Sequence, residues 1–135
     1  MRYNMVFKYT VLVLWCMSDM SAFAMNTSFD EVVKNASTAL KESNAKKLAA
    51  IFDNSVNLSV KRDEGAFTKF QAELLLNDFF RTNKVDELKE MQRANSSTTS
   101  FVVFSLKANS TNYRVFIKFV QTNNKEFKIA ELRIE

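Results

Sequence analysis

The stretch KFQAELLLNDFFRT, Lys69 to Thr82, decides how this sequence folds, because it carries the strongest helical pattern in the chain. Thr68 and Gln71 form a capping box that starts the predicted helix. Apolar residues recur three and four positions apart and line one side of it, with Phe70 and Leu74 at the edge of that stripe. The stripe consists of Ala72, Leu75, Leu76, Phe79 and Phe80. Such a helix needs an apolar surface to cover, and the flanking segments indicate a sheet.

Four strands are predicted after this helix. The segment from Asp86 to Ala94 is polar, with Leu88 as its main apolar residue, which is typical of a strand near a sheet edge. SFVVFSLK at 100–107 and YRVFIKFVQ at 113–121 are apolar-rich strands, and residues 127–135 end the chain as a fourth. Short polar turns join them, so neighbouring strands should pair antiparallel.

Two helices are predicted before the first strand. Ser28 and Glu31 form another capping box, and the apolar spacing after it predicts a helix over Phe29–Glu42. Asn44 can cap a second, short helix over residues 45–52.

A strand and a hairpin link these helices to the long one. Val56 to Val60 alternates apolar and polar residues, which predicts a strand with one dry face. A turn over Arg62–Gly65 leads back through a short partner strand at 66–67. The predicted order is α-α-β-β-α-β-β-β-β. The predicted class is α+β, with a strongly curved antiparallel sheet wrapped around helices.

This order resembles the cone-shaped nuclear transport factor 2-like fold. The segment Phe29–Val60, the EGxF turn at Glu64–Phe67, the pair Phe79-Phe80 and the closing ELRIE at Glu131–Glu135 are similar to an uncharacterised family of small exported bacterial proteins. The resemblance implies a curved sheet with an apolar pocket at its open end, and it implies export. It implies no activity, because none is assigned to that family, and the fold hosts enzymes, binders and dimerisation modules alike.

Residues 1–24 have the pattern of a signal peptide. Arg2 and Lys8 give a positive start, TVLVLWCM at 10–17 is apolar, and SAFA before position 25 favours a cut after Ala24. The apolar run is about half of the roughly 20 residues that a spanning helix needs, so we expect no stable membrane anchor. We predict a nuclear transport factor 2-like domain over residues 25–135 that is periplasmic or secreted.

The cysteine and histidine content excludes several kinds of chemistry. The chain has no His, and its one Cys is Cys16, which we interpret as part of the signal because Trp15 precedes it where a lipoprotein signal has a small residue. The mature domain then lacks thiol nucleophiles, His or Cys metal ligands and a histidine relay, and we expect no cofactor or metal. The formal net charge is +4, or +3 without Arg2, Lys8 and Asp19, which does not favour nucleic acid.

An enzyme of this fold, such as an isomerase or dehydratase, would be expected to use a carboxylate and a tyrosine inside the pocket. Tyr113 shares a strand face with apolar residues, so its hydroxyl either lines a pocket mouth or ends the core. The carboxylates fall outside the apolar pattern, and we interpret them as solvated. They are Asp53, Glu73, Asp78 and Glu131.

A second set of residues is a candidate ligand site. Inward rings of this kind suit a flat apolar ligand, although the same rings also suit a packed core. An arginine near the open end suits an anionic group. The candidates are Phe67, Phe80, Phe104, Tyr113 and Arg81.

The two long strands are apolar on both faces at their centre. Phe101, Val103, Phe116 and Val120 lie on the face away from the predicted core and are candidates for a homodimer interface. Three functions stay open. The first is a non-catalytic exported module, as a homodimer, that binds a small apolar ligand or an envelope protein. The second is an enzyme that uses a pocket carboxylate and Tyr113, and the third is a structural accessory of an envelope complex.

Overall fold

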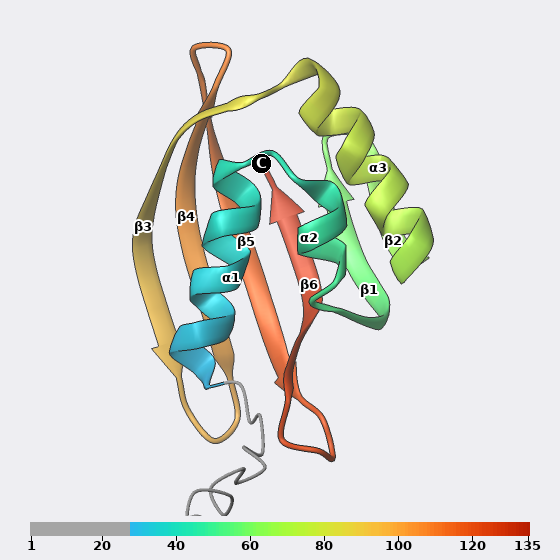
Figure 1. Cartoon of the computed structure of the whole chain (residues 1–135), viewed down its shortest axis with the longest axis vertical. Coiled ribbons are helices and arrows are strands. Elements are labelled where there is room, and N and C mark those ends of the chain that lie inside the picture. Colours follow the sequence, from blue (N-terminus) through green and yellow to red (C-terminus); the bar gives the residue numbers. More distant parts are fainter. Residues whose placement is uncertain (1–27) are drawn as a thin grey trace, which may run out of the picture.

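Three helices lie on one side of a six-stranded sheet in the computed structural model, which describes residues 28–135 (Figure 1). The helices are α1 (Phe29–Lys41), α2 (Ala45–Ala49) and α3 (Lys69–Thr82). The strands are β1 (Phe52–Val60), β2 (Asp63–Thr68), β3 (Val85–Asn95), β4 (Ser100–Ala108), β5 (Thr111–Gln121) and β6 (Phe127–Ile134). The predicted class and element order are confirmed, whereas the predicted signal, with Cys16 and the cut after Ala24, lies outside the described residues.

The sheet is open, with β2 and β3 at its edges and the order β2-β1-β6-β5-β4-β3. The prediction of an edge position for the polar strand β3 is confirmed. Strands joined by a short turn pair antiparallel, as predicted, but β1 and β6 pair parallel. The chain's last strand comes to lie beside its first because the helices and the other strands between them form a crossover.

Two local predictions near the first strand are wrong. The short helix ends at Ala49 instead of residue 52, because β6 recruits the next residues into the sheet: the backbone N–H of Ile129 donates to the carbonyl oxygen of Ile51 at 2.8 Å. The hairpin turn lies at Lys61 and Arg62, with Lys61 at φ 55°, and not at Arg62–Gly65. Gly65 does take a positive φ of 154°, but it does so inside β2.

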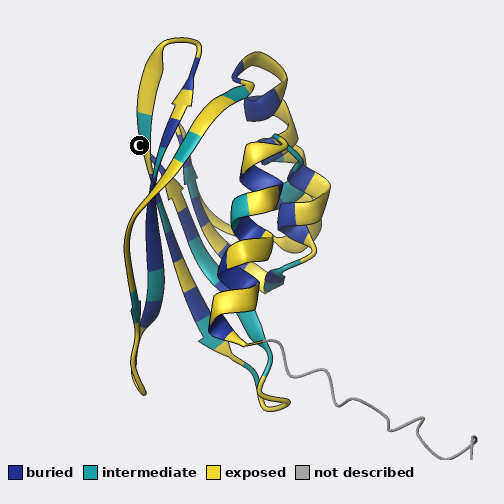
Figure 2. Ribbon diagram, turned by 60° about the vertical axis from the view of Figure 1, so that its left-hand side comes forward, coloured by how far each residue is buried: buried dark blue, intermediate teal, exposed yellow. Residues whose placement is uncertain are grey.

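The core lies between the helices and the sheet face that they cover, which we call the inner face. Figure 2 shows buried positions on the helix sides that face the sheet and at alternate positions along the strands. α3 packs on α2, β1 and β2, while α1 packs on α2 and β3, so the helices divide the inner face between them. The predicted stripe of α3 is buried except for half-buried Leu75, and its edge residues Phe70 and Leu74 are exposed.

No helix within residues 28–135 has the length and apolar character needed to span a membrane.

Candidate functional site

The five predicted ligand residues do not share one groove. Phe80 and Arg81 line an open groove of about 520 Å³ at the end of the cone where α1 and α3 finish. Phe104 and Tyr113 line a different groove of about 500 Å³ across β3, β4 and β5. Phe67 is half-buried on β2 and packs against the core. The ring of Phe104 itself is a core side chain, only 1% exposed.

Arg81 is engaged on its own helix. Its Nη2 lies 2.7 Å from Oδ1 of Asp78, and both side chains are largely exposed. The groove beside it also carries Lys41 and Lys84, which sit where the carbonyl ends of α1 and α3 attract cations. Those charges therefore have a structural explanation at the helix ends.

The hydroxyl of Tyr113 is hydrogen-bonded to a buried side-chain amide. This hydroxyl donates to Oδ1 of Asn83 at 3.3 Å, and the tyrosine ring lies edge-to-face on Phe79 at 5.5 Å. Asn83 is 6% exposed, and its Nδ2 donates to the carbonyl oxygen of Phe79 at 3.0 Å. The network ends α3 and satisfies its polar groups. Asn83 was not among the predicted site residues, although its position directly after the predicted helix end is a signal for a capping residue.

The candidate carboxylates do not enter the core. Asp53 and Glu73 are half-buried, Asp78 is exposed, and half-buried Glu131 lies 3.2 Å from Nε of Arg133. Within residues 28–135 no Asp or Glu is buried, and no three His, Cys, Asp or Glu side chains gather as a metal site would require.

Among the groups of residues 28–135, two have clearly shifted pKa values, and both belong to one ion pair. Arg93 on β3 donates to both carboxylate oxygens of Glu90, at 2.9 and 2.6 Å, and its third nitrogen lies 2.6 Å from Oδ1 of Asp30 on α1. These hydrogen bonds hold the pKa of the Glu90 carboxyl below its ordinary value and raise the pKa of Arg93. The cluster joins α1 to β3, which is a structural role.

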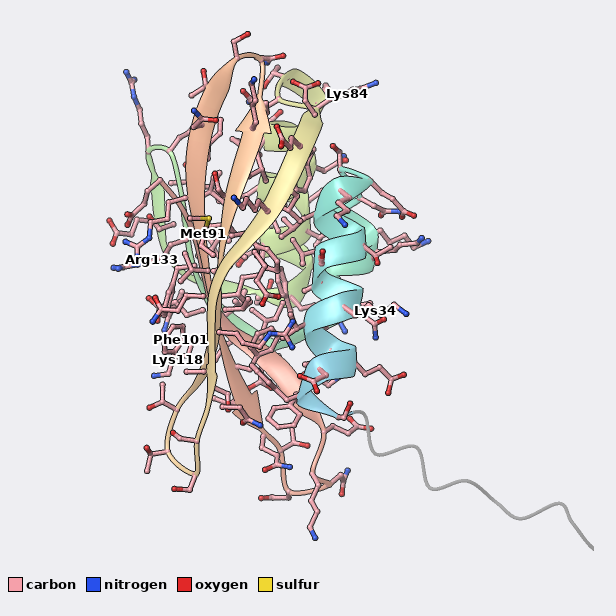
Figure 3. The ribbon with its side chains drawn as sticks, turned by 90° about the vertical axis from the view of Figure 1, so that its left-hand side faces the viewer. Lys34, Lys84, Met91, Phe101, Lys118 and Arg133 are labelled. Atoms are coloured by element: carbon pink, nitrogen blue, oxygen red, sulfur yellow. The ribbon has the colours of Figure 1, made fainter. Side chains whose placement is uncertain are left out.

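The structure brings the four predicted interface residues together on the face of the sheet that points away from the helices, which we call the outer face. The rings of Phe101 and Phe116 stack with their centroids 5.7 Å apart and their planes 30° from parallel. Val103 pairs with Phe116 across the strands and is 5% exposed, and Val120 is half-buried. In Figure 3, Met91 and Phe101 lie on this side of the sheet, while Lys34 on α1 projects from the opposite side.

The outer face is divided into an apolar half and a polar half. Along one row the cross-strand neighbours are Ala94, Phe101, Lys118, Glu131, Asn57 and Ala66, and along the next they are Gln92, Val103, Phe116, Arg133, Ser59 and Glu64. The large apolar residues of these rows therefore lie on β4 and β5, beside Gln92 and Lys118, and both rows are polar on β6 and β1. We call Met91, Phe101, Val103, Phe116 and Val120 the outer-face patch.

Met91 belongs to this patch because of a bulge in β3, which the sequence pattern does not reveal. The register of β3 against β4 shifts between Glu90 and Gln92, so Met91 is the extra residue of a bulge and is 60% exposed. With Val103, Ser105 and Arg114 it lines the groove across β4. A bulge interrupts strict alternation, so a period of two does not place Met91.

Comparisons with known proteins agree with this architecture. The model of a family described as "Domain of unknown function (DUF4783)" matches residues 33–135. A crystal structure of a DUF4783 family protein from Bacteroides uniformis is 25% identical, with a TM-score of 0.72, over 77% of this chain and 95% of that one. No curated protein matches the chain.

More distant structures share the fold alone. An NTF2-like protein of unknown function from Cytophaga hutchinsonii is 7% identical, with a TM-score of 0.60, over 83% of this chain and 92% of that one. A ketosteroid isomerase-like protein from Erwinia carotovora is 12% identical, with a TM-score of 0.65, over 84% of this chain and 96% of that one. The resemblance to the nuclear transport factor 2-like fold and to an uncharacterised family is confirmed.

Proposed function

The chain belongs to the DUF4783 family, and from that premise we propose that it is a non-catalytic exported binding module that forms a homodimer through the outer face of its sheet. The observation that carries this proposal is the outer-face patch. Its stacked rings, Phe101 and Phe116, are only half-buried, whereas the central inner-face residues of the same strands are at most 1% exposed, namely Val102, Phe104, Val115 and Ile117. Contiguous exposed apolar surface with aromatic anchors is typical of protein interfaces.

The charges around the patch suit a second copy of the same surface. Arg114 and Lys118 on β5 are exposed and take part in no ion pair among residues 28–135. Glu131 lies in the same row as Lys118, and Glu135 lines a small groove with Arg114 and Phe116. A self-complementary contact requires one surface to carry both partners of each interaction. The outer face has an apolar centre and a rim that carries charges of both signs, so it meets that requirement.

The non-catalytic part of the proposal rests on the interior of the cone. An isomerase-type site would need a carboxylate near Tyr113 that burial keeps at a shifted pKa. The partner of Tyr113 is the amide of Asn83, and the carboxylates of residues 28–135 are half-buried or exposed. The ketosteroid isomerase-like neighbour, at 12% identity, supports the fold and carries no activity to this chain.

Light scattering coupled to size-exclusion chromatography tests the dimer. We expect the mature protein to run as a dimer at micromolar concentration, and we expect Phe116→Lys to convert it into a folded monomer. Leu74→Lys is the matched control, because it places the same charge at an exposed leucine on α3. A strict monomer would overturn the homodimer. Co-purification with one envelope protein that Phe116→Lys abolishes would favour the structural accessory instead.

Export is tested separately by mass spectrometry of the protein recovered from a periplasmic fraction. The signal pattern of residues 1–24 supports a mature chain that begins at Met25. An intact Met1 on protein from the cytoplasmic fraction alone would contradict it.

A further inference from the structure

Two large apolar side chains are exposed on the helical side of the molecule, away from the outer-face patch. Phe70 is 67% exposed and Leu74 is 53% exposed, although α3 buries Ala72, Leu76 and Phe79 on its other side. Phe70 and Leu74 are four residues apart, so they project from neighbouring turns of one helix surface. The core does not require either side chain, so their exposure is unexplained by packing.

A groove runs beside Phe70, between α2 and α3. Its volume is about 400 Å³, and its lining combines Ala49 and Ala50 from the end of α2 with Phe70 from α3. Small alanine side chains let another backbone approach closely, and an aromatic side chain beside them provides an apolar wall. Grooves between helices commonly accept the apolar side of an amphipathic helix.

Two lysines on the rim lack acidic partners. Lys46 on α2 and Lys69 at the start of α3 both line the groove, and neither takes part in an ion pair among residues 28–135. Lys47, the neighbour of Lys46, does find one: its Nζ lies 2.7 Å from Oε2 of Glu42. The groove therefore combines an apolar lining with two unpaired lysines and one carboxylate, that of half-buried Glu73.

We propose that the groove between α2 and α3 docks a short amphipathic helix of a partner protein, with apolar residues on one side and carboxylates flanking them. The apolar side would contact the exposed Ala50 and Phe70, beside Ala49, which is itself buried, and the carboxylates would pair with Lys46 and Lys69. A helical segment fits better than a flat lipid surface, because the site is a concave groove between two helices. This site is independent of the proposed dimer, because it lies on the other side of the sheet.

A pair of synthetic peptides tests the proposal directly. The first is an amphipathic helix with leucines at positions i, i+3, i+4 and i+7 and glutamates beside them, and the second has lysines in place of the glutamates. Titration calorimetry and amide chemical shifts would be recorded with the mature protein. We expect saturable binding of the acidic peptide, with shifts centred on Ala49, Ala50 and Phe70, and binding of the lysine peptide about tenfold weaker or absent.

Variants at exposed positions separate docking from folding. Phe70→Ser should weaken the acidic peptide about tenfold or more, as loss of an aromatic anchor does. Lys34→Ser changes an exposed side chain of α1 that lines neither the groove nor the outer-face patch, and it should leave binding unchanged. The double variant Lys46→Glu with Lys69→Glu should reverse the preference toward the lysine peptide.

Three results would overturn the proposal. One is the absence of binding by both peptides. Another is a set of amide chemical-shift changes that lies away from α2 and α3, or that persists unchanged in Phe70→Ser. The third is Phe70-dependent binding to phosphatidylglycerol–phosphatidylcholine vesicles without binding of the acidic peptide, which would identify a lipid surface as the occupant.

Discussion

The two faces of the sheet are built from the same strands and differ in what covers them. On β4, Val102, Phe104 and Leu106 point to the inner face and are at most 1% exposed, because helices cover that face. Phe101 points to the outer face and stays half-buried, stacked only on Phe116 of the next strand. Successive side chains of a strand point to opposite faces, so a strand with apolar residues at consecutive positions presents two apolar faces. Only the inner one is needed for the fold, which leaves the outer one available for association.

The largest effect is expected from removing a ring of the inner face. Phe104→Ala should lower the free energy of unfolding by about 3–5 kcal/mol, since it leaves a cavity in a core that has little room to relax. Urea denaturation followed by circular dichroism at one fixed protein concentration would measure this.

Phe116→Ala is the matched experiment on the outer face. It should cost the monomer less than about 2 kcal/mol, because the ring is half-buried and water can fill the space, while it weakens dimerisation. Equal losses of monomer stability from the two variants would mean that both faces belong to the core.

Removing the amide that ends α3 should have the next largest effect. Asn83→Ala deprives the Tyr113 hydroxyl of its acceptor and the Phe79 carbonyl of a donor, and we expect a loss of about 1–3 kcal/mol. Asn77→Ala, at an exposed position of the same helix, is the control. Thermal unfolding monitored by circular dichroism distinguishes the two, and indistinguishable midpoints would show that water replaces the network without cost.

A smaller effect is expected from the N-terminal cap of α3, one of the helices that cover the inner face. The Thr68 hydroxyl accepts from the N–H of Gln71 at 3.2 Å, and the Gln71 side chain accepts from the N–H of Thr68 at 3.1 Å. Thr68→Ala should cost about 1 kcal/mol, and Thr68→Ser should restore most of it. Hydrogen exchange of the first turn of α3 is the measurement; unchanged exchange rates in Thr68→Ala would rule out the capping contribution.

The smallest effect is expected at the ion cluster that ties α1 to β3. Arg93 lowers the pKa of Glu90 in the folded state, so the ion pair contributes its stability above the ordinary glutamate pKa and loses it as the pH falls through the lowered value. Both side chains are 37% exposed, so solvent screening limits the contribution to a few tenths of a kcal/mol. As the pH falls from neutral to acidic, the free energy of unfolding of Glu90→Gln should decrease less steeply than that of the parent protein. If stability decreased equally steeply with pH in the two proteins, the ion pair would not make this contribution.

Local patterns predicted most of the elements. Helical spacing and the capping box located α3 from Lys69 to Thr82, and alternation separated Phe101 and Val103 from the core side of β4. The same reasoning misplaced the end of α2, because Ile51 is hydrogen-bonded to Ile129, far along the chain. The candidate ligand residues formed one predicted set, although Phe80 and Arg81 line one groove, Phe104 and Tyr113 line another, and Phe67 packs against the core. Which rings share a cavity depends on how helices pack, and a single sequence does not record that.

Periodicity and capping predicted the elements, their order and the apolar residues on both faces of β4 and β5, because these signals depend on residues a few positions apart. Tertiary structure decided the parallel pairing of β1 with β6, the bulge that turns Met91 outward and the meeting of Tyr113 with Asn83. The pairing of β1 with β6 and the contact of Tyr113 with Asn83 join segments distant in sequence, and the bulge depends on the exact register of β3 against β4. None of these is recorded in a pattern of residues a few positions apart.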